Sequence, residues 1–209
     1  MRRLIPFLLA ALALAPAGLA ARENQDAGVD GRVGQTSYVA SQVWKPLGLS
    51  GLSSRWRTSS PGAARQQTAL ATEIVQGINL ERRARGLKAL VTSTKLAAAA
   101  AQHTREMASQ GYFEHESFDA TPFWKRIERW YPSKGWRSWS VGENLLYSSP
   151  TVTAGEGIEL WMNSPPHRAN MLSRSWREIG ISAIHFESAP GEYDGQPVTI
   201  VTADFGIRR

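Results

Sequence analysis

The chain contains no cysteine, and this absence excludes several classes of chemistry. Without a thiol, the protein forms no disulfide, offers no cysteine nucleophile and cannot hold a metal through thiolates. Thiol redox chemistry and cysteine-protease chemistry are excluded on the same ground. Stability must therefore come from a packed core, which a domain of about 140 residues is long enough to bury.

Long hydrophobic runs are also scarce. The run at the N-terminus spans residues 4–15, follows two arginines and is broken by Pro16. It is shorter than the roughly 20 residues that a helix needs to cross a bilayer, and the small residues after it are typical of a secretory signal peptide. We expect residues 1–20 to be a cleaved signal peptide, with no transmembrane segment after its removal and an extracytoplasmic location. An uncleaved N-terminal anchor is the alternative.

Acidic residues are fewer than basic ones, and the whole chain has a net charge of +6. The excess lies outside the part that is expected to fold, because residues 67–209 hold 16 Lys and Arg against 15 Asp and Glu. A domain this close to neutral does not favour nucleic-acid binding. Residues 21–66 are rich in Gly, Ser, Gln and Thr and lack sustained hydrophobic periodicity, so we expect a flexible leader there.

Residues 67–209 show helical patterns first and strand patterns last. Apolar periodicity and capping residues predict four helices, which begin at Thr68, after Ser93, at Pro122 and after Thr153. Thr121 is the predicted N-cap of the third helix. Alternating or continuous apolar runs predict strands over 142–148, 178–186 and 198–206. This order is typical of an α+β domain.

Three segments carry residues suited to a single site. They are GYFEHES at 111–117, VGENL at 141–145 and WMNSPPHRANML at 161–172, and they contain His115, Glu143 and His167. The chain has neither the HExxH helix of zinc proteases nor the GxSxG turn of serine hydrolases. The spacing of the three residues does not by itself show that their side chains converge.

These segments, with INLERRARGLKAL at 78–90 and TADFG at 202–206, resemble in their order the CAP superfamily of cysteine-rich secretory, antigen 5 and pathogenesis-related proteins. They are most similar to its cysteine-free bacterial branch, the SCP-like extracellular proteins. The resemblance implies an α-β-α sandwich over residues 67–209, with a central antiparallel sheet flanked by helices. It also implies a central cavity, and the positions that match its lining are His115, Glu143 and His167.

Two positions depart from the better-known eukaryotic members of that superfamily. Three residues after Trp161 those members have a glutamate where this chain has Ser164, and their late His-Tyr-Thr-Gln segment is not recognisable here. The Thr-Gln pair that the bacterial branch has near its end reads Thr202-Ala203 in this chain. The expected site is therefore His115, Glu143 and His167, with Ser164 or Asp204 nearby. Imidazole and carboxylate are good ligands for Zn²⁺ and similar ions, so we expect a divalent metal as cofactor, with Zn²⁺ the first candidate.

Three interpretations of this site remain open. The site binds a divalent metal, a small molecule, a lipid or a cell-envelope ligand; or it is a buried hydrogen-bond network without a ligand; or its His and Glu side chains hydrolyse peptide or cell-wall material. We expect binding rather than turnover. Segment 123–139, in which tryptophans alternate with Lys and Arg, is a further surface suited to envelope sugars or lipids.

Overall fold

A four-strand path with the order β1-β4-β5-β3 forms the centre of the structure, a computed structural model that describes residues 60–209. The expected signal peptide and the leader up to residue 59 lie outside the described residues. The strands are β1 (Ala64–Gln66), β4 (Glu178–Phe186), β5 (Val198–Arg208) and β3 (Trp139–Ser148). Neighbours in this order are antiparallel, and β2 (Val91–Thr92) pairs with β4 in parallel.

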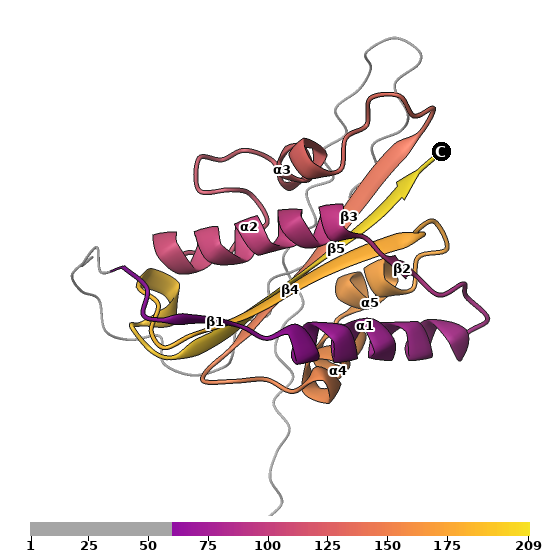
Figure 1. Cartoon of the computed structure of the whole chain (residues 1–209). Helices are drawn as coiled ribbons and strands as arrows, with labels where there is room; N and C mark the ends of the chain where they lie inside the picture. The colour runs from indigo at the N-terminus through magenta and orange to yellow at the C-terminus, as the bar shows by residue number, and fades with distance from the viewer. Residues whose placement is uncertain (1–59) are drawn as a thin grey trace, which may run out of the picture. The chain divides into compact units, whose positions relative to one another are not determined.

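Helices cover both faces of this sheet, as Figure 1 shows. The face that we call the α2 face carries α2 (Thr94–Gln110) and α3 (Phe123–Trp130). The opposite face, the α1 face, carries α1 (Thr68–Arg83), α4 (Ala154–Asn163) and α5 (Pro165–Met171). A short 3-10 helix, η1 (Gly191–Tyr193), precedes β5. This arrangement is the α-β-α sandwich expected from the sequence.

Side chains of the central strands alternate between the two faces, and this alternation decides where the buried polar groups lie. On β5, Ala203 and Phe205 pack in the apolar cluster of the α1 face. Thr202 lies on the α2 face, where its Oγ1 is 2.9 Å from Oγ1 of Thr104 on α2. Asp204 shares that face with Thr202, so a carboxyl group lies beneath α2 in the middle of the sheet.

The ends of the helices largely follow the sequence patterns. Gly111 ends α2 in the left-handed region with a φ of 68°, and Thr153 and Glu156 form the predicted capping box of α4. The predicted cap of α3 was wrong by one residue, because Pro122 occupies the N-cap position and Thr121 does not cap the helix. None of the helices within residues 60–209 is both long and apolar enough to cross a membrane.

Three short elements were missed, and the smallest of them is the two-residue strand β2. β1 lies inside the expected leader, and its pairing with β4 places the start of the sheet at Ala64 rather than after residue 66. α5 has seven residues and begins with Pro165 behind Ser164 at the N-cap. Two, three or seven residues are too few to show a hydrophobic period, so none of these elements could be predicted from the sequence pattern.

The close approach of α2 to β4 depends on Gly180. A Cβ at this position would lie 2.0 Å from the backbone nitrogen of Ala97 and 2.3 Å from the carbonyl carbon of Leu96. Backbone atoms cannot move aside as a flexible side chain can, so we expect Gly180→Ala to lower the free energy of unfolding by about 1–3 kcal/mol. Urea unfolding measures this, with Gly155→Ala on α4 as the control because a Cβ there meets nothing within 4 Å. Equal stability of the two variants would contradict the prediction.

Candidate functional site

Glu143 lies in the middle of β3 and is fully buried on the α2 face. Its Oε1 accepts a hydrogen bond of 2.8 Å from Nδ1 of His115, and its Oε2 forms an ion pair with Nη2 of Arg126 on α3. Burial raises the pKa of the carboxyl, but the nearby charges of Arg126, His103 and His115 outweigh burial and lower it to about 2. Glu143 is therefore an ionised carboxylate, and both of its oxygens are engaged.

A second buried carboxyl group, Asp204 of β5, lies directly opposite Glu143 in the strand register. On the side of β3 that faces away from β5, the carbonyl of Glu143 accepts from Asn170 and the carbonyl of Leu145 accepts from Trp161, both at 3.1 Å. Because these carbonyls point away from β5, Glu143 and Asp204 form a non-hydrogen-bonded pair, in which cross-strand side chains come closest. Burial raises the pKa of Asp204 well above its ordinary value, and the charge of Glu143 adds to this, so Asp204 is the protonated member of the pair.

His115 follows α2 in the loop of residues 111–122 and is 7% exposed. Because the carboxylate of Glu143 only accepts hydrogen bonds, Nδ1 of His115 carries a proton and donates it to Glu143 in a hydrogen bond. Arg126 also donates from Nη1 to the backbone carbonyl of His115 at 3.0 Å. One guanidinium group thus holds both Glu143 and the segment that carries His115.

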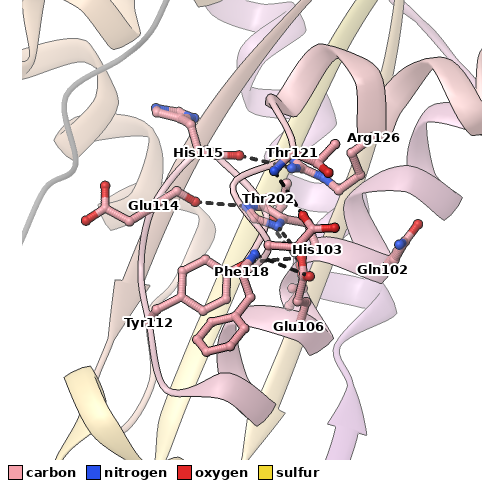
Figure 2. A network of polar contacts seen from close by, with 12 residues as sticks. Gln102, His103, Glu106, Tyr112, Glu114, His115, Phe118, Thr121, Arg126 and Thr202 are labelled. Carbon is pink, nitrogen blue, oxygen red and sulfur yellow. Dashed lines mark hydrogen bonds and ion pairs between the residues drawn. The ribbon is translucent and has the colours of Figure 1, made fainter.

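The same loop is fixed to α2 by a second polar network, shown in Figure 2. His103 is fully buried; its Nε2 donates to the carbonyl of Glu114 at 2.9 Å, and its Nδ1 lies 3.4 Å from Oε2 of Glu106. Glu106 also accepts from the hydroxyl of Tyr112 at 2.9 Å and from the backbone nitrogen of Phe118 at 3.4 Å. The hydrogen bond from His103 is the main reason why the pKa of Glu106 falls to about 2. His115 is therefore presented by a loop that is anchored at several points.

On its other side, β3 is joined to α5 through the residues that flank Glu143. Asn144 donates from Nδ2 to the backbone carbonyl of His167 at 3.1 Å, and Asn170 donates to Oδ1 of Asn144 at 2.9 Å. A Cβ on Gly142 would lie 2.6 Å from Oδ1 of Asn170, so a glycine is needed for this close approach. These contacts bring α5, and with it His167, against the edge strand.

His167 is 1% exposed and lies on the α5 side of β3. Its Nδ1 is 2.7 Å from Oγ of Ser164, and its Nε2 forms no hydrogen bond within residues 60–209. Burial lowers the pKa of His167 to about 4, and the charge of His115 contributes to the shift. The ring is therefore neutral at physiological pH.

The structure joins His115 to Glu143 and places His167 on the opposite side of β3. His167 is near enough for the charge of His115 to affect its pKa. Within residues 60–209, no three His, Asp or Glu side chains are arranged to hold a metal ion. Both oxygens of Glu143 are engaged, by His115 and by Arg126, so this carboxylate orients the ring of His115 through Nδ1 rather than acting as a metal ligand. Metal binding stays a prediction.

Arg126 is the residue of this site that sequence reasoning missed. It is fully buried on α3 although it carries a charge. One signal was available, because Phe123, Arg126, Ile127 and Trp130 follow the i, i+3, i+4, i+7 spacing of the buried face of a helix. A charged residue within such a stripe indicates a buried ion pair.

Only part of the tryptophan-rich segment 123–139 is a surface. Trp130 and Trp136 are 43% and 47% exposed, and Arg208 lies 5.0 Å above the ring of Trp136. Trp139 is 4% exposed, and its Nε1 donates to the carbonyl of Tyr131 at 2.7 Å. Trp139 therefore belongs to the core, and Trp124 is half-buried against it. Trp130 and Trp136 are the exposed tryptophans of this segment and remain candidates for contact with sugars or lipids.

The buried neutral ring of His167 predicts how stability changes with pH. The pKa of His167 is about 4 in the folded protein, against an ordinary value of 6.5. Between pH 4 and pH 6.5 the residue is therefore protonated in the unfolded chain but not in the folded one. The free energy of unfolding should therefore fall as the pH drops from 6.5 to 4, by about 2–3 kcal/mol from this residue. Urea unfolding in the presence of EDTA, at pH 7 and at pH 4.5, measures the change. The fall should be smaller in His167→Gln, and equal falls in the two proteins would show that His167 is not its source.

Comparisons with known proteins agree with this fold. The sequence profile of the cysteine-rich secretory protein family, CAP, matches residues 75–205. The uncharacterized protein YkwD of Bacillus subtilis (strain 168) is 29% identical over 127 residues, which are 61% of this chain and 46% of YkwD. This chain therefore spans about half the length of that relative.

Two solved structures share the fold at low sequence identity. An extracellular protein of Bacillus anthracis that contains an SCP domain superposes with a TM-score of 0.52 at 24% identity, over 68% of this chain and 41% of that one. An outer surface protein of Borrelia burgdorferi superposes with a TM-score of 0.56 at 18% identity, over 71% of this chain and 99% of that one. Since the family profile covers more than half of the 209 residues, and the sheet and helices are those of an SCP domain, the chain belongs to the CAP family.

Proposed function

We propose that this CAP protein is an extracytoplasmic binding protein that takes a divalent metal ion, a small ligand or both at His115 and His167. The observation that carries the proposal is Nε2 of His167, a buried nitrogen of a neutral ring without a hydrogen bond inside residues 60–209. An unsatisfied buried polar atom costs about 1–3 kcal/mol. A metal ion, or a donor group of a ligand, would supply the missing partner.

The chemistry of the two rings suits this role. Neutral imidazole is the commonest nitrogen ligand for metals, and a carboxylate behind the ring raises its strength as a ligand. Glu143 provides this support to His115, and Oγ of Ser164 can accept from Nδ1 of His167 so that the lone pair lies on Nε2. A bound divalent ion would supply Lewis acidity, while the protein residues bind and orient it.

An extracytoplasmic location is supported from two sides. The first twenty residues have the pattern of a secretory signal peptide. The two structural neighbours are described as an extracellular protein and an outer surface protein. A lipid or cell-envelope ligand would be consistent with this location and with the exposed rings of Trp130 and Trp136.

Calorimetric titration of Zn²⁺ into the metal-free full chain at pH 7.5 tests the proposal. We expect saturable binding with about one ion per chain. Because protons compete with metal for imidazole, the affinity should be lower at pH 5.5 if the ring of His115 is a ligand. Absence of binding at pH 7.5 would leave His115, Glu143 and His167 as a structural network or as a site for an organic ligand.

Hydrolysis of peptide or cell-wall material is the alternative function. Ser164 and His167 form a hydrogen bond of 2.7 Å, as a nucleophile and its base do. However, no carboxylate within residues 60–209 bonds to Nε2 of His167, and a pKa of about 4 makes this ring a weak base at neutral pH. Turnover of peptidoglycan or casein that is lost on chelation would favour the hydrolase, whereas metal binding without turnover would favour the binding protein.

A further inference from the structure

A cavity of about 240 Å³ lies away from the histidines, where the C-terminal end of α1 meets the loop between α5 and β4. Among residues 60–209, those that line it are four basic residues, Arg82, Lys88, Arg174 and Arg177, together with Gly86 and Leu87, and none of them is acidic. The volume equals that of about eight water molecules in the liquid, so a small ligand fits. Residues 67–209 as a whole are close to neutral, so the charge of this cavity is a local feature.

Arg82 is the unusual member of this set, because its side chain is fully buried. Its Nε donates to the carbonyl of Lys88 at 2.9 Å, and its Nη1 donates to the carbonyls of Met171 and Ser173 at 2.7 and 2.9 Å. These are neutral acceptors, so they orient the guanidinium group without neutralising its charge. Burial lowers the pKa of Arg82, and the charge of Arg177 adds to this, as expected for two cations held close together.

Arg177 is held in a similar way. Its Nη1 contacts the carbonyls of Arg174, Ser175 and Trp176 at 2.8, 3.3 and 2.8 Å. Within residues 60–209, Nη2 of Arg82 and Nη2 of Arg177 take part in no hydrogen bond, and no carboxylate pairs with any of the four cations. Arg82 and Arg177, which both line the cavity, are thus fixed through Nη1, and Nη2 of each remains as a hydrogen-bond donor.

We propose that this cavity is an anion site that binds a phosphate group, either free or carried by a larger molecule. Holding four cations together without an acid is unfavourable in isolation, and a multiply charged anion would offset their repulsion. Phosphate carries up to two negative charges near neutral pH and offers more acceptor oxygens than a carboxylate, so more than one arginine can donate to it at once. The site is separate from His115 and His167, so its existence does not depend on metal binding.

Titration of inorganic phosphate into the full chain at low ionic strength, followed by calorimetry, tests the proposal. The test variant is Lys88→Ala/Arg174→Ala, because neither side chain makes a hydrogen bond or ion pair within residues 60–209 and its loss should leave the fold intact. The control is Arg83→Ala/Arg85→Ala, which removes the same charge from exposed positions at the same end of α1 but outside the cavity. Urea unfolding of each variant checks that it is folded.

We expect saturable phosphate binding by the wild-type chain, a loss of at least tenfold in affinity in Lys88→Ala/Arg174→Ala, and a change of less than twofold in the control. No saturable binding by the wild-type chain, or equal weakening in both variants, would overturn the proposal, since equal weakening indicates non-specific charge attraction. Vesicles of phosphatidylcholine with phosphatidic acid distinguish the source of the phosphate. Vesicle binding that inorganic phosphate displaces would identify a lipid headgroup, and phosphate binding without vesicle binding would identify a soluble or glycan-borne phosphate.

Discussion

Replacing Arg126 with methionine is expected to lower the free energy of unfolding by about 3–5 kcal/mol at pH 7. In the wild-type protein the guanidinium of Arg126 forms an ion pair with Glu143, and both side chains are fully buried. Methionine keeps much of the volume but none of the charge, so Glu143 would be left ionised in the interior without its main partner. The hydrogen bond to the carbonyl of His115 would be lost as well. Urea unfolding at pH 7 measures the effect.

Two further variants separate the buried charge from the loss of packing. Arg129→Met, at an exposed position on the same helix, should change stability by less than about 0.5 kcal/mol. Arg126→Met/Glu143→Gln removes both charges, and we expect it to recover more than half of the loss, because breaking a buried pair costs more than replacing it. A loss below about 1 kcal/mol in Arg126→Met, or no recovery in the double variant, would show that the ion pair does not stabilise this site.

Loss of His167 should weaken binding of Zn²⁺ by about 100-fold or more. Mutation of groups that merely support a metal ligand costs about 10–100-fold in affinity, and His167 is proposed to be a ligand itself. His167→Gln keeps a polar side chain of similar size but has no imidazole nitrogen. Because the pKa of His167 is about 4, protons should not compete for this ring until the pH approaches that value. Calorimetric titrations at pH 7.5 with wild-type and variant chains measure the difference.

A matched histidine elsewhere in the sheet serves as the control. His185 of β4 is also buried, and its Nδ1 lies 3.1 Å from Oγ1 of Thr199. His185→Gln removes an imidazole from the interior without touching the proposed site, so it should bind Zn²⁺ as the wild-type chain does. Equal affinities of wild-type protein and His167→Gln would rule out His167 as a ligand, and equal losses in both variants would point to destabilisation instead.

The Gly-Glu-Asn segment of β3 has three separate physical roles. Gly142 leaves room for the side chain of Asn170. Glu143 forms an ion pair with Arg126 and accepts a hydrogen bond from His115. Asn144 donates a hydrogen bond to the backbone carbonyl of His167 on α5. Successive residues of a strand point to opposite faces, so one short segment ties α3 and the His115 loop on one side to α5 on the other. The motif therefore fixes His115 on one side of β3 and His167 on the other.

The sequence was sufficient for the long elements. α1, α2 and α4 and the strands β3, β4 and β5 were predicted because hydrophobic periodicity, the glycine at 111 and the Thr153 capping box are local signals. β1, β2 and α5 were missed because they are too short to show a period. Their existence depends on partners far away in the chain, such as the pairing of Arg65 with His185.

The candidate site was only partly visible in the sequence. The motifs indicated His115, Glu143 and His167 and allowed Asp204 as a neighbour, and the strand register places Asp204 opposite Glu143. The motifs did not reveal the protonated state of Asp204 or the engagement of both Glu143 oxygens. These properties depend on burial and on Arg126, which is seventeen residues from Glu143 in sequence but in direct contact with it.

The sequence by itself determined that this protein has no thiol chemistry and that its helices and strands occur in the order of a CAP domain, and it indicated three polar residues as candidates for one site. Only the tertiary structure decided which of these residues meet, which carboxyl group is ionised and where four cations gather without an acid. The reason is physical: secondary structure follows from spacing along the chain, whereas charge states and hydrogen-bond partners follow from burial and from distances between residues that are remote in sequence.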